Sequence, residues 1–123
     1  MNINTHEISK HVTLEYCQVP LLKEHPSIIQ DVKKYIDILM SKISNELKKE
    51  NKTLNQFLDD ENAFENIDIE DILYNIVIIL HCNALDNFMK YEDVVSDRFY
   101  EYYLNSFDIE IGDYIVALLK EQC

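Results

Sequence analysis

The sequence predicts an all-α protein, a compact bundle of five to six helices that forms a single domain over residues 1–123. Three observations lead to this prediction. The chain contains one glycine and two prolines, whereas an all-β fold needs a turn about every 8–12 residues. Hydrophobic residues make up 47% of the chain, enough to fill one core without disulfides or metal. Many of them also recur at the three- and four-residue spacing of a helix face.

The first predicted element, residues 4–19, fits two kinds of secondary structure. Asn4 with Glu7 three residues later is typical of a helix N-terminus, which favours a helix. The alternation of apolar and polar residues from Val12 to Tyr16 equally suits a short strand. We favour the helix.

The clearest prediction is a core-facing helix of about six turns that follows the second proline. Pro26 suits its first turn, because the N–H that proline lacks has no partner there. The helix should end in the solvated run KKENK, residues 48–52, where cations favour the helix C-terminus. Its apolar stripe consists of Ile28, Ile29, Val32, Tyr35, Ile36, Leu39, Met40, Ile43 and Leu47.

Two further helices are predicted from their caps. Thr53 and Gln56 form a capping box for a short helix, and Asp68 is placed to cap a longer one. The longer helix is apolar on two sides, so it lies at the centre of the bundle or shows its second side to another chain. We favour the central position. The second apolar side consists of Ile78, Cys82, Leu85 and Met89.

The last two predicted helices cover residues 92–106 and 108–121. The second of them opens with Asp108, Ile109 and Glu110, a pattern that matches the start of the preceding long helix. A duplicated helical hairpin would explain the shared pattern. We favour reuse of the same capping chemistry, because acidic residues in a first turn interact favourably with the helix dipole.

The formal net charge of −12 argues against direct binding to nucleic acid or to an anionic membrane. The charge is unevenly placed. Residues 1–61 contain 8 lysines and 10 acids, a balance of −2, whereas residues 62–123 contain 3 basic residues and 13 acids, a balance of −10. Six of the eight tyrosines also lie in the second part. The acidic, tyrosine-rich part is therefore the place to look for function.

We expect a cytoplasmic protein. The N-terminus has no basic start followed by an apolar run, and the longest apolar run, Ile76–Leu80, is far shorter than a membrane span of about 20 residues. The three cysteines, Cys17, Cys82 and Cys123, are widely spaced and form no CxxC pair. Reduced thiols therefore fit better than a disulfide framework.

The sequence offers no pattern that indicates an enzyme, a metal site or a cofactor. His6 and His11 are five residues apart, whereas a zinc-binding HExxH helix needs a spacing of four. His81 and Cys82 are neighbours, and neighbours on a helix point about 100° apart. With Gly112 as the only glycine, the chain has no phosphate-binding loop of the glycine-rich kind.

An acidic stripe marks the predicted helix 92–106. Asp93, Asp97 and Glu101 are four residues apart, although like charges at that spacing cost an isolated helix about 0.2–0.5 kcal/mol per pair. Tyr100 and Leu104 fall beside this stripe, away from the side predicted to face the core. Apolar groups beside exposed acids are typical of interfaces, and a solvated acidic face is the alternative. The predicted partner-binding residues are Asp93, Asp97, Tyr100, Glu101, Tyr103, Leu104, Asp108 and Glu110.

These features favour a binding protein. Our hypothesis is an immunity- or antitoxin-type inhibitor that neutralises a basic partner, such as a nuclease toxin, by blocking its positive cleft. Two alternatives stay open. One is a nucleic-acid mimic that blocks a defence protein. The other is a homodimeric helical chaperone or adaptor, with Ile78, Cys82, Leu85 and Met89 as its dimer or client face.

Overall fold

The computed structural model describes residues 3–16, 26–84 and 109–122, and these residues form helices without a strand. The prediction of an all-α bundle is confirmed, whereas the predicted helix 92–106 lies outside the described residues. The elements in chain order are α1 (Thr5–Tyr16), α3 (Ile28–Glu50), α4 (Leu54–Asp59), the 3-10 helix η1 (Ala63–Asn66), α5 (Glu70–Ala84) and α8 (Ile109–Glu121).

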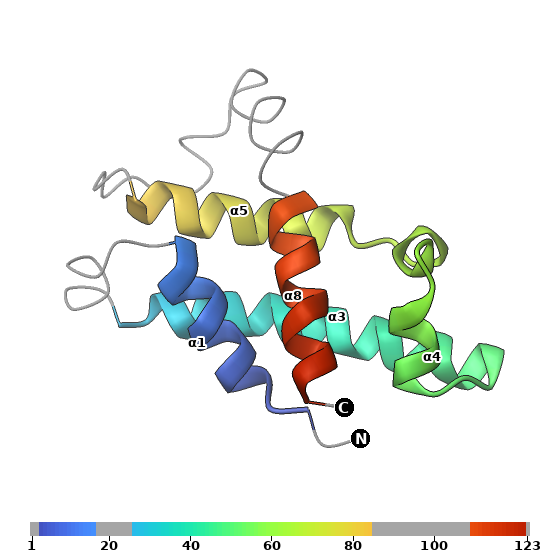
Figure 1. The fold of residues 1–123 in the computed structure, drawn as a ribbon. Coiled ribbons are helices and arrows are strands. Elements are labelled where there is room, and N and C mark those ends of the chain that lie inside the picture. Colours follow the sequence, from blue (N-terminus) through green and yellow to red (C-terminus); the bar gives the residue numbers. More distant parts are fainter. Residues whose placement is uncertain (1–2, 17–25, 85–108, 123) are drawn as a thin grey trace.

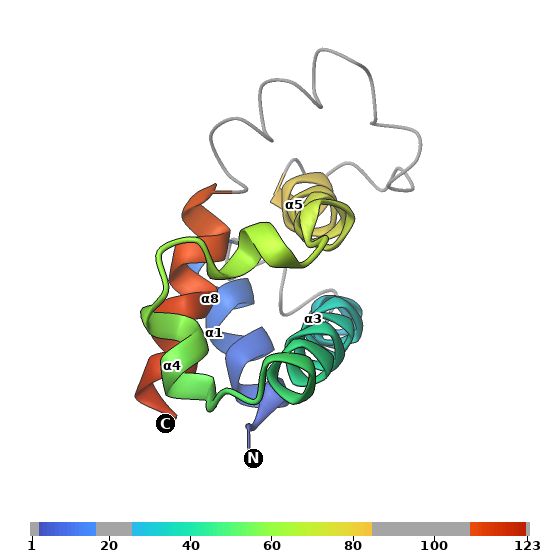
Figure 2. The same ribbon diagram turned by 90° about the vertical axis from the view of Figure 1, so that its right-hand side faces the viewer.

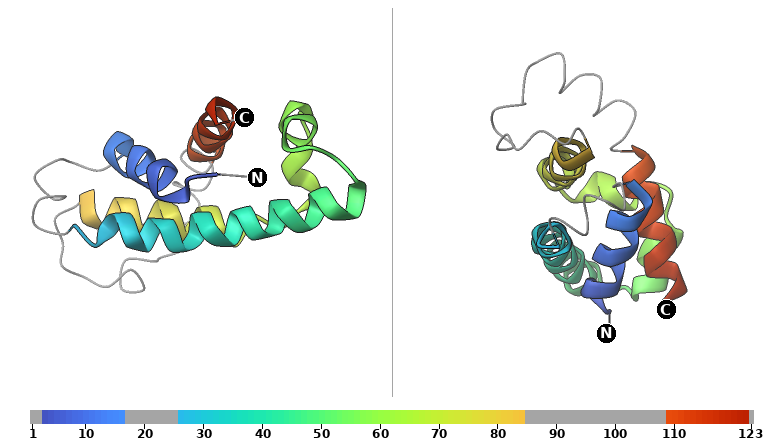
Figure 3. Two further views of the ribbon diagram at one scale, coloured as in Figure 1. Left: turned by 90° about the horizontal axis from the view of Figure 1, so that it is seen from below. Right: turned by 90° about the vertical axis from the view of Figure 1, so that its left-hand side faces the viewer.

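The helices form two layers. Helices α3 and α5 lie side by side and antiparallel, and they run horizontally in Figure 1. Helices α1 and α8 cross them on one side, as the end-on views in Figures 2 and 3 show. Helix α1 contacts α8 in its own layer and both α3 and α5 in the other layer. The two ends of the described chain meet, because the backbone N–H of Asn4 donates to Oε1 of Gln122 at 2.8 Å.

Helix α1 settles the choice between helix and strand for the first element. The backbone N–H of Glu7 donates to Oδ1 of Asn4 at 3.1 Å, which is the expected N-cap bond. Ile8 and Val12, one helical turn apart, are buried, whereas Leu14 is 44% exposed. A strand would have placed Val12 and Leu14 on the same face, so the strand alternative is wrong.

Two hydroxyl side chains on α1 are fully buried, and both form hydrogen bonds. Oγ of Ser9 donates to the carbonyl oxygen of Thr5 at 2.7 Å, and Oγ1 of Thr13 donates to that of Ser9 at 2.6 Å. Bonds of this kind to the carbonyl four residues back let polar side chains enter a core without an unpaired donor.

Helix α3 follows its predicted stripe closely. Its buried residues are Ile28, Val32, Ile36, Leu39, Met40 and Ile43. The helix begins at Ile28 and ends at Glu50 inside the predicted KKENK run. Asn51 then takes a left-handed conformation, φ 53°, and its N–H donates to the carbonyl of Leu47. Pro26 precedes the N-cap residue Ser27, so it lies just before the first turn and not in it as predicted.

The capping box of α4 is confirmed. The backbone N–H of Gln56 donates to Oγ1 of Thr53 at 3.2 Å, and the N–H of Thr53 donates to Oε1 of Gln56 at 2.9 Å. These reciprocal bonds satisfy two donors that the start of a helix leaves free. The short helix then buries Leu54, Phe57 and Leu58.

Helix α5 begins one residue later than its predicted cap requires. The carbonyl of Ile69 accepts the first helical bond, from the N–H of Leu73 at 2.9 Å, so Ile69 and not Asp68 occupies the cap position. Asp68 lies one residue before the cap. Glu70 and Asp71 still fall in the first turn, where their charges favour the helix dipole.

The middle of α5 is buried on every side. The five residues from Ile76 to Leu80 are each at most 3% exposed, and five residues cover more than one full turn of a helix. Ile76, Val77, Ile79 and Leu80 belong to the common core and Ile78 does not, so the central position of α5 stays a prediction for its second apolar side. None of the helices in the described ranges is long and apolar enough to cross a membrane.

Candidate acidic binding surface

The end of α1 and one side of α8 bring together tyrosines and carboxylates that are distant in the sequence. The rings of Tyr16 and Tyr114 meet edge to face, with centroids 6.0 Å apart and an interplanar angle of 84°. Such a geometry is favourable for aromatic pairs. We call this surface the acid–tyrosine patch. It consists of Glu15, Tyr16, Glu110, Asp113, Tyr114 and Glu121.

The sequence spacing of the patch residues on α8 explains why they lie on one side of the helix. Glu110, Asp113, Tyr114 and Glu121 recur at intervals of three, four and seven residues, so they line one side of the helix. The opposite side is apolar and buried. It consists of Ile111, Ile115, Leu118 and Leu119. The core therefore fixes the rotation of α8 and presents the acids outward.

Carboxylates surround the tyrosine pair. Burial is the main cause that raises the pKa of Tyr16 above its usual value of 10.0, and the negative charges of Glu110, Glu15 and Asp113 raise it further. Burial likewise raises the pKa of Tyr114, followed by the charges of Glu15 and Glu121. Both hydroxyls therefore stay protonated at neutral pH in a field of negative charge.

Four carboxylates give the patch its negative charge. Glu15, Glu110, Asp113 and Glu121 are all exposed. Within residues 3–16, 26–84 and 109–122, no basic side chain forms an ion pair with any of the four.

Two exposed apolar side chains directly precede patch residues in the chain, Leu14 before Glu15 and Ile109 before Glu110. Ile109 is 63% exposed at the start of α8, and Leu14 is 44% exposed in the last turns of α1. Apolar groups next to half-buried aromatic rings and exposed charges are the composition of a protein interface. The arrangement suits recognition of lysine and arginine side chains, which carboxylates bind as ion pairs and tyrosine rings bind through their faces.

The structure places one of the predicted partner-binding residues, Glu110, and it lies in this patch. The other seven lie outside the described residues. They are Asp93, Asp97, Tyr100, Glu101, Tyr103, Leu104 and Asp108. Sequence reasoning missed Glu15 and Tyr16, because they lie about 95 positions before Glu110 and no local pattern links them. Their signal was compositional only, an acid next to a tyrosine at the end of a predicted helix.

The predicted dimer or client face on α5 is placed in part. Ile78 is buried, with 3% of its surface exposed. Cys82 belongs to α5, but its side chain lies outside what the structure describes, as do Leu85 and Met89. The prediction that these four residues form a common face stays a prediction.

The histidines of the N-terminal HEISKH run are surface residues of α1. His6 and His11 are exposed, and Nε2 of His11 lies 3.9 Å from a carboxylate oxygen of Glu7, one helical turn away. In the described part of the chain, no three histidine, cysteine or acidic side chains come close enough together to hold a metal ion.

Comparisons of the chain with protein-family models, with curated proteins and with solved structures find no match.

Proposed function

We propose that this protein is an acidic inhibitor of immunity or antitoxin type, which neutralises a basic partner protein such as a nuclease toxin by occupying its positive cleft. The observation that carries the proposal is the acid–tyrosine patch. It combines four exposed carboxylates with an aromatic pair and two exposed aliphatic side chains.

The charge distribution supports the same partner chemistry. The patch draws three of its four acids from residues 62–123, the part of the chain with a balance of −10. A surface of this sign attracts a basic protein over about a Debye length and accelerates association. Nucleases present such a basic surface, because a cleft that grips phosphates must be positive.

The experiment begins with the full chain as bait in a lysate of its source cells, at low salt and at about 0.5 M salt. We expect a basic protein that binds at low salt in a one-to-one complex and loses its own activity when bound. Capture of neutral or acidic proteins alone, or a complex in which the partner stays fully active, would contradict the proposal.

Charge reversal then locates the interface on the purified complex. We expect E15K/E110K/D113K to raise the dissociation constant about a hundredfold, because three attractive contacts become repulsive. The matched control, D59K/D60K/E61K, changes the net charge equally at exposed acids at the end of α4 and just after it, and should cost less than about fivefold. Equal losses in both variants would show that only net charge matters.

A third variant tests the stripe predicted from the sequence. D93K/D97K/E101K should weaken the complex as strongly as reversal of the patch, if the predicted helix 92–106 extends the same interface. An unchanged dissociation constant for this variant, beside a loss for the patch variant, would confine the interface to α1 and α8.

A further inference from the structure

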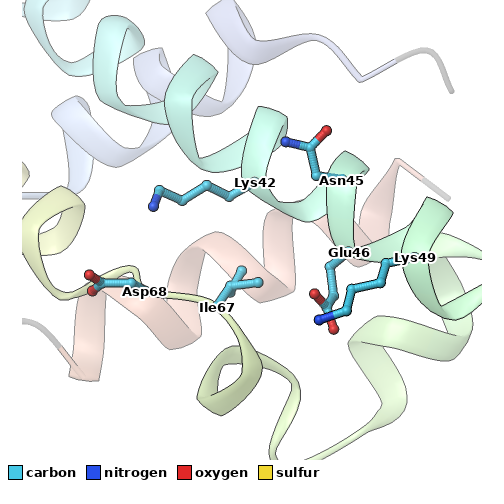
Figure 4. A pocket seen from close by; sticks show the side chains of 6 residues that line it. All are labelled: Lys42, Asn45, Glu46, Lys49, Ile67 and Asp68. Atoms are coloured by element: carbon cyan, nitrogen blue, oxygen red, sulfur yellow. The ribbon is translucent and has the colours of Figure 1, made fainter.

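A groove runs between α3 and the segment that leads into α5. It consists of two adjoining cavities, of about 210 and 220 Å³, that share Lys42 and Asp68 as lining residues. Figure 4 shows the first cavity, with Lys42 reaching out from α3 and Asp68 from the segment before α5. Both side chains point toward the same end of this cavity, where the second cavity adjoins it.

The two walls of the groove carry opposite charges. The α3 wall presents Lys42 and Lys49 with Glu46 between them, a balance of +1, and the opposite wall presents Asp68 and Asp71, a balance of −2. In the part of the chain that the structure describes, Lys42 and Asp68 form no ion pair with each other or with another residue. Each wall therefore offers charges that a bound surface can pair.

An apolar surface continues along the α3 wall. Ile38 is 39% exposed, and Tyr35, one helical turn earlier, is half-buried against the core. Tyr35, Ile38 and Lys42 line the second cavity and follow one another at helical spacing. The groove thus has an apolar section beside a charged one, which is the composition of a self-complementary contact.

The charge of the whole chain restricts where a second copy can approach. Two chains of −12 repel each other at most surfaces. Six of the eleven basic residues lie between Lys33 and Lys52, on α3 and just after it. The α3 side is therefore where repulsion between copies is weakest and where unlike charges can meet.

We propose that the groove is a self-association surface, in which a second copy of this chain docks across it about a two-fold axis that runs along the groove. Rotation about such an axis exchanges the two walls, so Lys42 of each copy faces Asp68 of the other, and Ile38 of each copy faces the other copy's wall before and in α5. The proposal is independent of the proposed inhibitor function, because the groove belongs to α3 and α5 and the acid–tyrosine patch belongs to α1 and α8.

Light scattering and sedimentation equilibrium of the full chain test the proposal. The wild-type mass should rise with concentration from 14.6 kDa toward twice that value. K42E and D68K should each raise the dimer dissociation constant about tenfold, because each turns two symmetric attractive contacts into repulsive ones. An equimolar mixture of the two variants should restore dimerisation, because an all-acidic groove then meets an all-basic one.

The mixture distinguishes a contact between two copies from a contact within one copy. A pairing between Lys42 and Asp68 of the same chain would give no rescue when the two variants are mixed, so a mixture that stays monomeric overturns the proposal. K48E is the matched control, since Lys48 is exposed on α3 but does not line the groove, and it should dimerise as the wild type does. A wild type that is monomeric at every concentration, or a dimer indifferent to K42E and D68K, also overturns it. Circular dichroism verifies that each variant is folded.

Discussion

Helices α3 and α5 lie next to each other in one layer, yet they bury their residues in different ways. Helix α3 has 23 residues and buries a single stripe, whereas Ile38 remains 39% exposed in its middle. Helix α5 has 15 residues and buries Ile76 to Leu80 without a break. Helix α3 also carries an ion pair on its surface, Lys33 Nζ to Asp37 Oδ2 at 2.7 Å.

The difference shows how the hydrophobic pattern of a helix corresponds to its position in the bundle. An apolar stripe with charges on the opposite side specifies a helix at the edge of a bundle, because burial is favourable for only one side of it. A helix that is apolar all round gains stability only where neighbours cover every side. Helix α5 contacts α1, α3 and α8, and its residues Ile76, Val77, Ile79 and Leu80 join the common core.

Alanine substitution of isoleucines should make this comparison quantitative. We expect I76A and I78A on α5, and I36A on α3, each to lower the free energy of unfolding by about 2–5 kcal/mol. Ile76 and Ile36 are fully buried, and Ile78 is 3% exposed. Chemical denaturation monitored by circular dichroism measures the change.

Ile38 is the matched control within α3. I38A should cost less than about 0.5 kcal/mol at concentrations where the chain is monomeric, because the side chain is already partly in water. A small effect for I78A would contradict its burial in the monomer. It would support the prediction that Ile78 belongs to a dimer or client face.

A smaller effect is expected where α5 meets α8. Gly112 is buried in α8, and a Cβ added to it would lie 3.6 Å from Cδ1 of Leu73 on α5, an ordinary van der Waals distance. G112A should therefore stabilise the protein by about 0.5–1 kcal/mol, because alanine has the higher helix propensity. Thermal and urea unfolding measure it.

The larger variant G112L is the control for this contact. Its side chain has no room between the two helices, so it should destabilise by about 1–3 kcal/mol. If G112A were destabilising too, α5 and α8 would approach each other more closely than the Leu73 distance indicates.

The smallest effect concerns the polar side of α3. Burial of Asp37 tends to raise its pKa, but hydrogen bonds from Lys33 and Thr5 and the charge of Lys33 together lower it below the usual 3.8. A carboxylate with a lowered pKa in the folded state stabilises the protein above pH 3.8 and loses that contribution as the pH falls through the folded pKa. Nuclear magnetic resonance titration should give a pKa below 3.8 for Asp37 and a higher one in K33M. Equal values in the two proteins would exclude Lys33 as a cause.

Much of the fold was predictable from local patterns. The N-cap of α1, the stripe of α3 and the capping box of α4 depend on residues within a few positions of each other, and the structure confirms all three. The cap of α5 was placed one residue early. Asp68 has the right side chain for a cap, but the first helical bond goes to Ile69.

The acid–tyrosine patch was predictable only in part. Glu110 was identified from the sequence as one acid in an acidic region. Its neighbours Glu15 and Tyr16 come from the other end of the chain, and the packing of α1 against α8 brings them to Tyr114. Contacts over such separations leave no periodic signal in a sequence.

By itself the sequence determined the helical class, the faces that turn inward and the location of the negative charge, because periodicity, caps and composition act locally. The tertiary structure decided which faces meet: Tyr16 with Tyr114, and Lys42 across a groove from Asp68. The physical reason is that burial selects one arrangement of amphipathic helices from many that share the same local patterns.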